Sequence, residues 1–165
     1  MQQDPPPRLS VSVIIPTFNR AAFITQAIDS VLNQTRVPEE IIVVDDGSTD
    51  ETSEILAQYG QALIVIRQDN QGRSAARNAG LRASTGDLIV FLDSDDLLTP
   101  ASIEHRAQIL ERTPEIGVVY GDMYLINSNG EHLGVHRQYT PGPRPSGYVL
   151  SELALRCFIL MPAMI

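Results

Sequence analysis

The sequence predicts an α/β fold of three layers, a sandwich in which helices cover both faces of a mostly parallel central sheet. Apolar runs and helical segments alternate four times along the first two thirds of the chain. The apolar runs are nearly continuous, as is typical of strands buried on both faces, and right-handed crossovers then join parallel neighbours. With 165 residues, of which 43% are hydrophobic, the chain is long enough for one domain with a core.

Four short apolar runs are expected to form the strands of this sheet, because polar or turn-forming residues bound each of them. In chain order, the expected strands are Val11–Ile15, Ile41–Val44, Ala62–Ile66 and Leu88–Leu92. The first helix is expected at residues 20–33, where apolar residues recur at helical spacing. The second is expected to begin at Ser48, since Ser48 and Glu51 have the spacing of a capping box, and to run to about Tyr59.

The third helix is expected at residues 72–84, which are rich in small side chains. Thr99 is expected to cap the fourth helix, with Pro100 at its first position. After Gly117 the pattern changes. The remaining expected elements are strands at residues 117–126 and 130–136 around an Asn-Ser-Asn-Gly turn, a Pro/Gly-rich loop at residues 140–147 and a short helix at Ser151–Arg156.

Composition excludes several classes of function. The net charge of −8 argues against a nucleic-acid-binding protein, which needs a basic surface. All 12 basic residues are arginine, so a phosphate-loop lysine, a Schiff base and a lysine general base are excluded. The single cysteine, Cys157, allows no internal disulfide and fits a reducing compartment. No transmembrane segment is expected, because the apolar run 157–165 is short and contains Pro162.

Polar and acidic residues follow each expected strand. The segments are Pro16–Asn19, Asp45–Ser48, Asp69–Arg73 and Asp93–Asp96. Ligands of an open parallel sheet bind beyond the carboxyl ends of its strands, so these segments predict one active site at one edge. Three carboxylates directly after a buried strand favour a divalent metal, because buried acids otherwise need another cationic partner.

Each segment taken alone also has an ordinary structural interpretation. Asp45 and Asp46 could begin a turn, and residues 70–72 could form a strand-to-helix connection. Arg73, at a helix start, is well placed for an anion, whereas Arg77 and Arg82 are interpreted as part of a solvated helix face. The three histidines lack the spacing of a zinc site.

Together, the four segments resemble the nucleotide-binding half of family 2 glycosyltransferases, which have the GT-A fold. The resemblance covers about residues 10–125 and is carried, in the family's order, by Val11–Arg20, Val43–Ser48, Gly72–Gly80 and Gly86–Asp96. It implies an enzyme that moves a sugar, with inversion, from a nucleotide-diphosphate sugar to an acceptor hydroxyl. The donor it favours is UDP-linked.

The resemblance also implies a set of binding residues. The implied nucleotide-binding residues are Pro16, Thr17, Phe18, Asn19, Asp46, Gly72, Arg73, Asp93 and Ser94. Asp46 would accept a hydrogen bond from the base. Asp95 would hold Mn²⁺ or Mg²⁺, and Asp93 would contact the ribose or the metal shell. Such a cation would stabilise the charge of the leaving diphosphate.

The polar, proline-rich N-terminus predicts a disordered lead over residues 1–9. By the resemblance, residues 10–126 would be a nucleotide-sugar-binding domain and residues 127–165 the start of an acceptor-side region, which we expect to be truncated because the sequence ends on an apolar segment. The family's catalytic base is an Asp or Glu beyond the position of Ile165. Glu152 does not match its context, so no base is assigned and this chain is expected to bind donor without completing transfer.

The expected partners are the nucleotide-sugar donor and a saccharide or lipid-linked acceptor. Many relatives build cell-surface polysaccharides, which implies a cytoplasmic location and allows a peripheral position at the inner membrane face. A homo-oligomer stays open.

Four other classes were considered. A haloacid-dehalogenase-like phosphohydrolase also places an Asp-x-Asp motif after an apolar strand, but it needs a lysine and carries the motif after its first strand. A Rossmann dehydrogenase would have glycines where Pro16–Phe18 stand. A nucleotidyltransferase would have a glycine-rich basic loop there. A non-catalytic nucleotide- or metal-binding module stays open, and a transfer assay on this chain beside a longer one would separate it from an enzyme.

Overall fold

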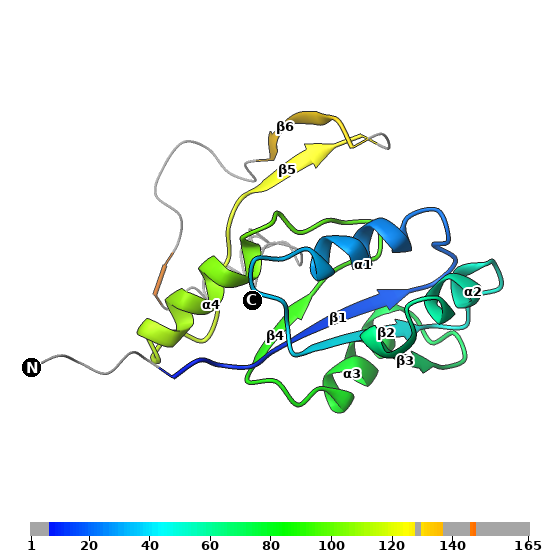
Figure 1. Cartoon of the computed structure of the whole chain (residues 1–165), viewed down its shortest axis with the longest axis horizontal. Coiled ribbons are helices and arrows are strands. Elements are labelled where there is room, and N and C mark those ends of the chain that lie inside the picture. The colour runs from blue at the N-terminus through cyan, green and yellow to red at the C-terminus, as the bar shows by residue number, and fades with distance from the viewer. Residues whose placement is uncertain (1–6, 128–129, 137–145, 148–165) are drawn as a thin grey trace, which may run out of the picture.

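The structure is a computed structural model that describes residues 7–127, 130–136 and 146–147 (Figure 1). Within these residues, the central sheet has four strands in the order β3-β2-β1-β4. Their bounds are Val11–Thr17 for β1, Glu40–Asp45 for β2, Ile64–Arg67 for β3 and Leu88–Phe91 for β4. Every neighbouring pair is parallel, which confirms the predicted α/β fold.

Helices cover both faces of the sheet. Their bounds are Ile24–Leu32 for α1, Thr52–Ala57 for α2, Arg73–Ala83 for α3 and Ser102–Arg112 for α4. Residues of α1, α2 and α4 share one apolar core with the sheet, and α3 packs on the opposite face. Figure 1 shows α1 above the strands and α3 below them. The predicted three-layer arrangement is therefore confirmed.

Strand β1 contributes to both cores because successive side chains of a strand point to opposite faces. Val11, Val13 and Ile15 face the core that α1, α2 and α4 share, and Ile14 faces α3. All four are fully buried. The run is nearly continuous because both faces are buried, and Ser12, the polar residue within Val11–Ile15, is buried with its hydroxyl donating to Glu40 at 2.5 Å.

Strand β3 departs from the prediction of strands buried on both faces. Ile64 and Val65 are 45% and 46% exposed, because β3 lies at the edge of the sheet. The strand also begins later than expected, since Ala62 belongs to a short 3₁₀ helix, η1 (Gly60–Ala62).

Helix α3 lies unusually close to the sheet. A Cβ atom placed on Gly80 would be 2.4 Å from Cγ2 of Ile14 and 3.3 Å from Cγ2 of Val44. Only glycine at position 80 therefore permits so short a distance between α3 and strands β1 and β2. This distance also determines where the arginines on the first turns of α3 lie relative to the ends of the two strands.

The predicted starts of α2 and α4 are wrong. Helix α2 begins at Thr52 and has no side-chain cap, because Ser48 is used elsewhere. The Ser48 hydroxyl accepts a hydrogen bond from the Asn19 amide at 3.0 Å, and the Ser48 amide donates to Oδ1 of Asp45 at 2.8 Å. Helix α4 begins at Ser102, beyond the expected Thr99–Pro100 start, and Thr99 makes no side-chain cap. In α2, a contact between loops has replaced the local capping pattern.

A hairpin of β5 (Met123–Ile126) and β6 (His132–His136) forms a second, antiparallel sheet. Both strands were predicted, although β5 is shorter than the expected segment 117–126. The expected helix 151–156 and nearly all of the expected loop 140–147 lie outside the described residues. No helix in the described parts of the chain is long and apolar enough to cross a membrane.

An ion pair ties the start of the described chain to α4. Arg36, before β2, pairs with Glu111 at 2.9 Å, and the two side chains are only 7% and 10% exposed. The Leu9 amide donates to the same Glu111 oxygen, and the Leu9 carbonyl accepts from Arg36. Leu9, which we placed in the disordered lead, is therefore held in the fold; residues 1–6 lie outside the description.

Candidate functional site

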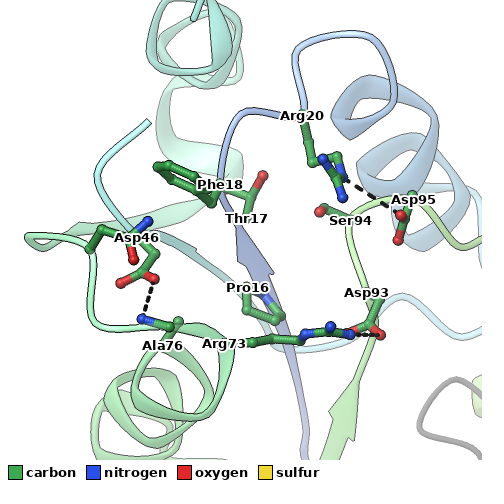
Figure 2. Close-up of a pocket in the computed structure, with 12 residues that line it drawn as sticks. Pro16, Thr17, Phe18, Arg20, Asp46, Arg73, Ala76, Asp93, Ser94 and Asp95 are labelled. Carbon is green, nitrogen blue, oxygen red and sulfur yellow. Dashed lines mark hydrogen bonds and ion pairs between the residues drawn. The ribbon is translucent and has the colours of Figure 1, made fainter. Parts of the chain in front are cut away.

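A cleft of about 490 Å³ opens where β1, β2 and β4 end and α3 begins (Figure 2). The residues that line it are Pro16, Thr17, Phe18, Arg20, Asp46, Asn70, Gly72, Arg73, Ala76, Asp93, Ser94 and Asp95. Every residue predicted to bind nucleotide or metal is in this set except Asn19. The expected convergence of the strand-end segments on one edge is thus present in the structure.

The end of β1 supplies an apolar wall and one free hydroxyl. Thr17 is 3% exposed, and within the described part of the chain its Oγ1 has no hydrogen-bond partner. A buried hydroxyl without a partner costs free energy, which a polar ligand atom in the cleft would recover. Phe18 is 42% exposed, so its ring can stack against a planar group.

Asn19 stands behind the cleft rather than in its lining. Its backbone has a φ of +52°, a conformation that asparagine tolerates better than most residues. Its Oδ1 accepts from the Thr49 amide at 2.8 Å, and its amide donates to Ser48. Asn19 therefore joins the loop after β1 to the loop after β2.

Asp46 organises the connection between β3 and α3. One carboxylate oxygen accepts from Nε2 of Gln68 at 2.7 Å and from the Gln71 amide at 3.0 Å, and the other accepts from the Gly72 amide at 2.8 Å. Gly72 has a φ of +88°, which favours glycine. The side chain is nearly buried, yet it borders the cleft.

Two arginines on successive turns of α3 hold Asp93. Nη2 of Arg77 is 2.5 Å from Oδ1 of Asp93, and Nη1 of Arg73 is 3.4 Å from Oδ2. Arg77 and Asp93 are each 19% exposed. The prediction of a solvated helix face therefore holds for Arg82, which is exposed, and is wrong for Arg77.

Asp95 is far less constrained than Asp93. Its carboxylate is 50% exposed and lies 3.6 Å from Nε of Arg20, which is itself 45% exposed. Figure 2 shows Asp93 and Asp95 on the same side of the cleft, with Arg20 reaching over Ser94 toward Asp95.

The third acid of this loop, Asp96, is half-buried outside the cleft lining. Burial and the negative charges of Asp93 and Asp95 raise the pKa of Asp96 to about 6. Asp96 thus lies in the field of two neighbouring carboxylates, and a nearby cation would lower the electrostatic energy of this group of acids.

We tested whether these residues fit a resident metal. Within the described residues, no three His, Cys, Asp or Glu side chains are arranged to hold a metal ion together. The chain would therefore supply only part of a coordination shell, with Asp95 as its most accessible carboxylate. Such a site fits a hard cation that takes its remaining ligands from substrate phosphates and water.

Arg20, Asn70 and Ala76 line the cleft but were not predicted as binding residues. Arg20 directly follows the segment Pro16–Asn19 and Asn70 lies within the segment Asp69–Arg73, so their position in the sequence carried a signal. Ala76 lies on α3, and its place in the lining depends on how that helix packs.

The chain is similar to known proteins over most of its length. The model of the family described as Glycosyl transferase family 2 matches residues 12–162. An uncharacterized glycosyltransferase of Nostoc sp. is 34% identical over 142 residues, which cover 84% of this chain and 43% of that protein. Glycosyltransferase GlyA of Streptococcus pneumoniae is 36% identical over 123 residues, or 72% of this chain and 17% of that protein.

Two solved structures are similar in both sequence and fold. Residues 1–349 of S. aureus TarS, in complex with UDP-GlcNAc, give a TM-score of 0.56 and 31% identity over 62% of this chain and 31% of that one. The mannosyltransferase PcManGT from Pyrobaculum calidifontis, in complex with GDP-Man and Mn²⁺, gives a TM-score of 0.57 and 32% sequence identity. The match covers 71% of this chain and 36% of that one. The chain spans less than half the length of these relatives.

Proposed function

Because the chain belongs to glycosyl transferase family 2, we propose that the cleft binds a nucleotide-diphosphate sugar and that the full protein transfers the sugar to an acceptor hydroxyl. One observation carries the proposal: polar groups from the ends of β1, β2 and β4 meet at one cleft with Arg73 of α3, and Arg77 of the same helix pairs with Asp93 of its lining. The nucleotide sugars bound to two similar structures support it.

The base and ribose would lie against the β1 and β2 walls of the cleft. The Phe18 ring would cover the base, and the free Thr17 hydroxyl would bond to the nucleoside. A carboxylate offers about four lone-pair sites, and Asp46 uses three of them within the protein. The remaining one could accept the N–H of a base such as uracil, which supports a UDP-linked donor.

Asn19 would act indirectly. Its side chain is engaged with the loop after β2, so we propose that it positions Phe18 and Asp46 rather than contacting the nucleotide.

The acids after β4 would divide the work at the diphosphate. Asp95, half exposed and loosely paired, would be the direct ligand of Mn²⁺ or Mg²⁺. Asp93, fixed by Arg73 and Arg77, would accept a ribose hydroxyl or a ligand of the metal shell. When bound, the cation would stabilise the charge that develops on the leaving diphosphate.

In the transfer itself, the acceptor oxygen would form a bond to the sugar's anomeric carbon as the bond from that carbon to the phosphate oxygen breaks. The electron pair leaves with the nucleoside diphosphate, and direct displacement inverts the carbon. A carboxylate general base, to which no residue is assigned, would take the hydroxyl proton. The single cysteine supports a cytoplasmic setting for this reaction.

Calorimetric titration of UDP into the chain tests the proposal, with Mn²⁺, with Mg²⁺ and with EDTA. We expect the metal to tighten UDP binding, and we expect Asp95→Asn to remove most of this gain, about tenfold or more in Kd, because one direct ligand is lost. Glu115→Gln, which removes an exposed carboxylate outside the cleft lining, is the matched control.

Two results would contradict the assignment in different ways. Absence of UDP and GDP binding to the folded chain would reject the donor site. Metal-dependent binding that survives Asp95→Asn unchanged would reject Asp95 as the metal ligand and leave the donor site standing.

A further inference from the structure

A second cavity of about 390 Å³ lies between the loop after β4, helix α4 and the β5–β6 hairpin. Asp95 lines both this cavity and the donor cleft. A ligand in the second cavity would therefore lie against the same side chain that we assign to the diphosphate end of the donor.

The unusual group in this cavity is Arg106 of α4. Its Nη1 is shielded from solvent and has no hydrogen-bond partner within the described part of the chain. The shielded arginines Arg36 and Arg77 differ, because each is ion-paired with a carboxylate. Burial lowers the pKa of Arg106, yet a guanidinium stays protonated in proteins. The cavity thus holds a partly desolvated guanidinium that forms no ion pair with the described carboxylates.

The lining of the cavity carries both signs of charge. Asp95, which also lines the donor cleft, and Asp96 belong to the loop after β4, whereas Arg106 lies on α4, one turn after Ser102, which also lines the cavity. Asp122 lines the cavity too and makes an interaction of its own. A ligand that fits this lining has a hydroxyl for Asp95 and an anionic group for the guanidinium.

We propose that the second cavity binds the acceptor and that the acceptor carries a phosphate or carboxylate group, which Arg106 holds so that the reacting hydroxyl faces Asp95. This inference rests on the proposed function, and it specifies the chemical class of the acceptor. An arginine fork pairs with either oxyanion in two-point geometry, so Arg106 is a specificity-determining residue for anionic over neutral acceptors.

The test uses three small probes of similar size: glycerol 3-phosphate, glycerate and uncharged glycerol. Each is titrated by NMR into the complete chain with the donor cleft already saturated by UDP and Mg²⁺, because Mg²⁺ is diamagnetic and does not broaden the signals. We expect one or both anions to bind and glycerol to bind much more weakly. The anion that binds more tightly identifies phosphate or carboxylate as the group recognised.

Arg106→Gln should weaken anion binding by about tenfold or more and leave the UDP Kd within about twofold, since one charged partner is removed outside the donor cleft. Arg106→Lys, which keeps the charge but not the fork, should restore part of the affinity. The control is Arg112→Gln, which replaces an exposed arginine at the end of the same helix. It should change neither anion affinity nor the UDP Kd.

Thermal unfolding distinguishes this proposal from a structural role. Removing a buried charge that has no partner should leave the Tm of Arg106→Gln unchanged or raise it. A lower Tm together with unchanged probe binding would overturn the proposal, as would wild-type chain that binds UDP but neither anion. Failure of UDP itself to bind would instead reject the donor site. If Arg106→Gln does not fold, Arg106→Lys provides the test instead. An anion affinity equal to that of the wild type in Arg106→Lys would contradict recognition by the two-point geometry of the guanidinium.

Discussion

Asp93 and Asp95 lie two residues apart, yet their carboxylates have different surroundings. Asp93 is 19% exposed and contacts two arginines, whereas Asp95 is 50% exposed and meets one arginine at 3.6 Å. A carboxylate held by two cations is a fixed acceptor with little capacity left for a metal. The geometry of the pair therefore supports a division of roles that the motif alone leaves open.

At the same scale, Thr17→Val should separate binding from stability. The Thr17 hydroxyl is buried without a partner in the described residues, so replacing it by a methyl group should not lower the free energy of unfolding. It should weaken UDP binding about fivefold, because a hydrogen bond of about 1 kcal/mol is lost from the complex. Urea unfolding and calorimetry measure the two quantities.

Thr52→Val provides the contrast. The Thr52 hydroxyl accepts from the Arg20 amide at 3.2 Å, so this variant should lose about 1 kcal/mol of stability. Equal UDP affinity in wild type and Thr17→Val would show that the Thr17 hydroxyl does not face the nucleotide.

The rule that parallel strands end at the same edge predicted which four segments meet, and the resemblance to family 2 glycosyltransferases supplied the individual residues within them. Neither could predict the roles of Arg77 and Arg106. Each lies on a helix among other polar residues. Only the packing of α3 shows that Arg77 contacts Asp93, and only the packing of α4 shows that Arg106 lines a cavity.

At the scale of elements, contacts between loops override local sequence signals. Ser48 and Glu51 have capping-box spacing, but the Ser48 hydroxyl accepts from Asn19 instead, and α2 begins at Thr52. Likewise, Oδ1 of Asp45 accepts from the Ser48 amide at 2.8 Å in the bend after β2, while Asp46 accepts from the Gly72 amide at the start of α3. The periodicity of the chain predicted that the elements exist; it could not predict ends that depend on distant partners.

Gly80→Ala should disturb the packing of α3. The new methyl group would stand 2.4 Å from Cγ2 of Ile14, so helix or strand must move. We expect a loss of about 1–2 kcal/mol in stability after the better helix propensity of alanine is counted. UDP binding should also weaken, because α3 carries Arg73 and Arg77. Urea unfolding and UDP titration measure both effects.

Gly117→Ala is the control, since a Cβ there would meet nothing within 4 Å. The double variant Gly80→Ala/Ile14→Ala should be more stable than the sum of its single changes, because Ile14→Ala removes the clashing methyl group. Strict additivity would show that the close approach of α3 to β1 is not the cause.

At the scale of the whole molecule, the sequence predicted the layers but not the strand order. The alternation of apolar runs and helices implies a parallel sheet, whereas the order β3-β2-β1-β4 depends on which crossovers pack best. The exposure of the β3 side chains follows from that order, since side chains at the edge of a sheet are less completely covered than those at its centre.

Glu40 connects distant parts of the chain and should make stability depend on pH. The Ser12 hydroxyl, the Thr85 amide and the Thr85 hydroxyl donate to its carboxylate at 2.5, 2.9 and 2.6 Å. These bonds lower the pKa of Glu40 in the folded protein below the usual 4.5. Its contribution to stability is therefore complete above that value and is lost as the pH falls through the lower, folded-state pKa.

Glu40→Gln should be less stable than wild type by about 1 kcal/mol near neutral pH, and the difference should shrink as the pH falls below the usual glutamate pKa. Urea unfolding from neutral to acidic pH measures it, with the exposed Glu115→Gln as the control. A difference that stays constant with pH would show that the carboxylate's charge is not responsible.

The contact of Leu9 with Arg36 and Glu111 lies before β1 and β2, whereas the donor cleft lies where these strands end. Leu9 and the cleft proposed for the donor are therefore at opposite ends of these strands. A linker that leads into the described structure at Leu9 should leave the cleft open to solution, which suits this chain to surface-based affinity measurements.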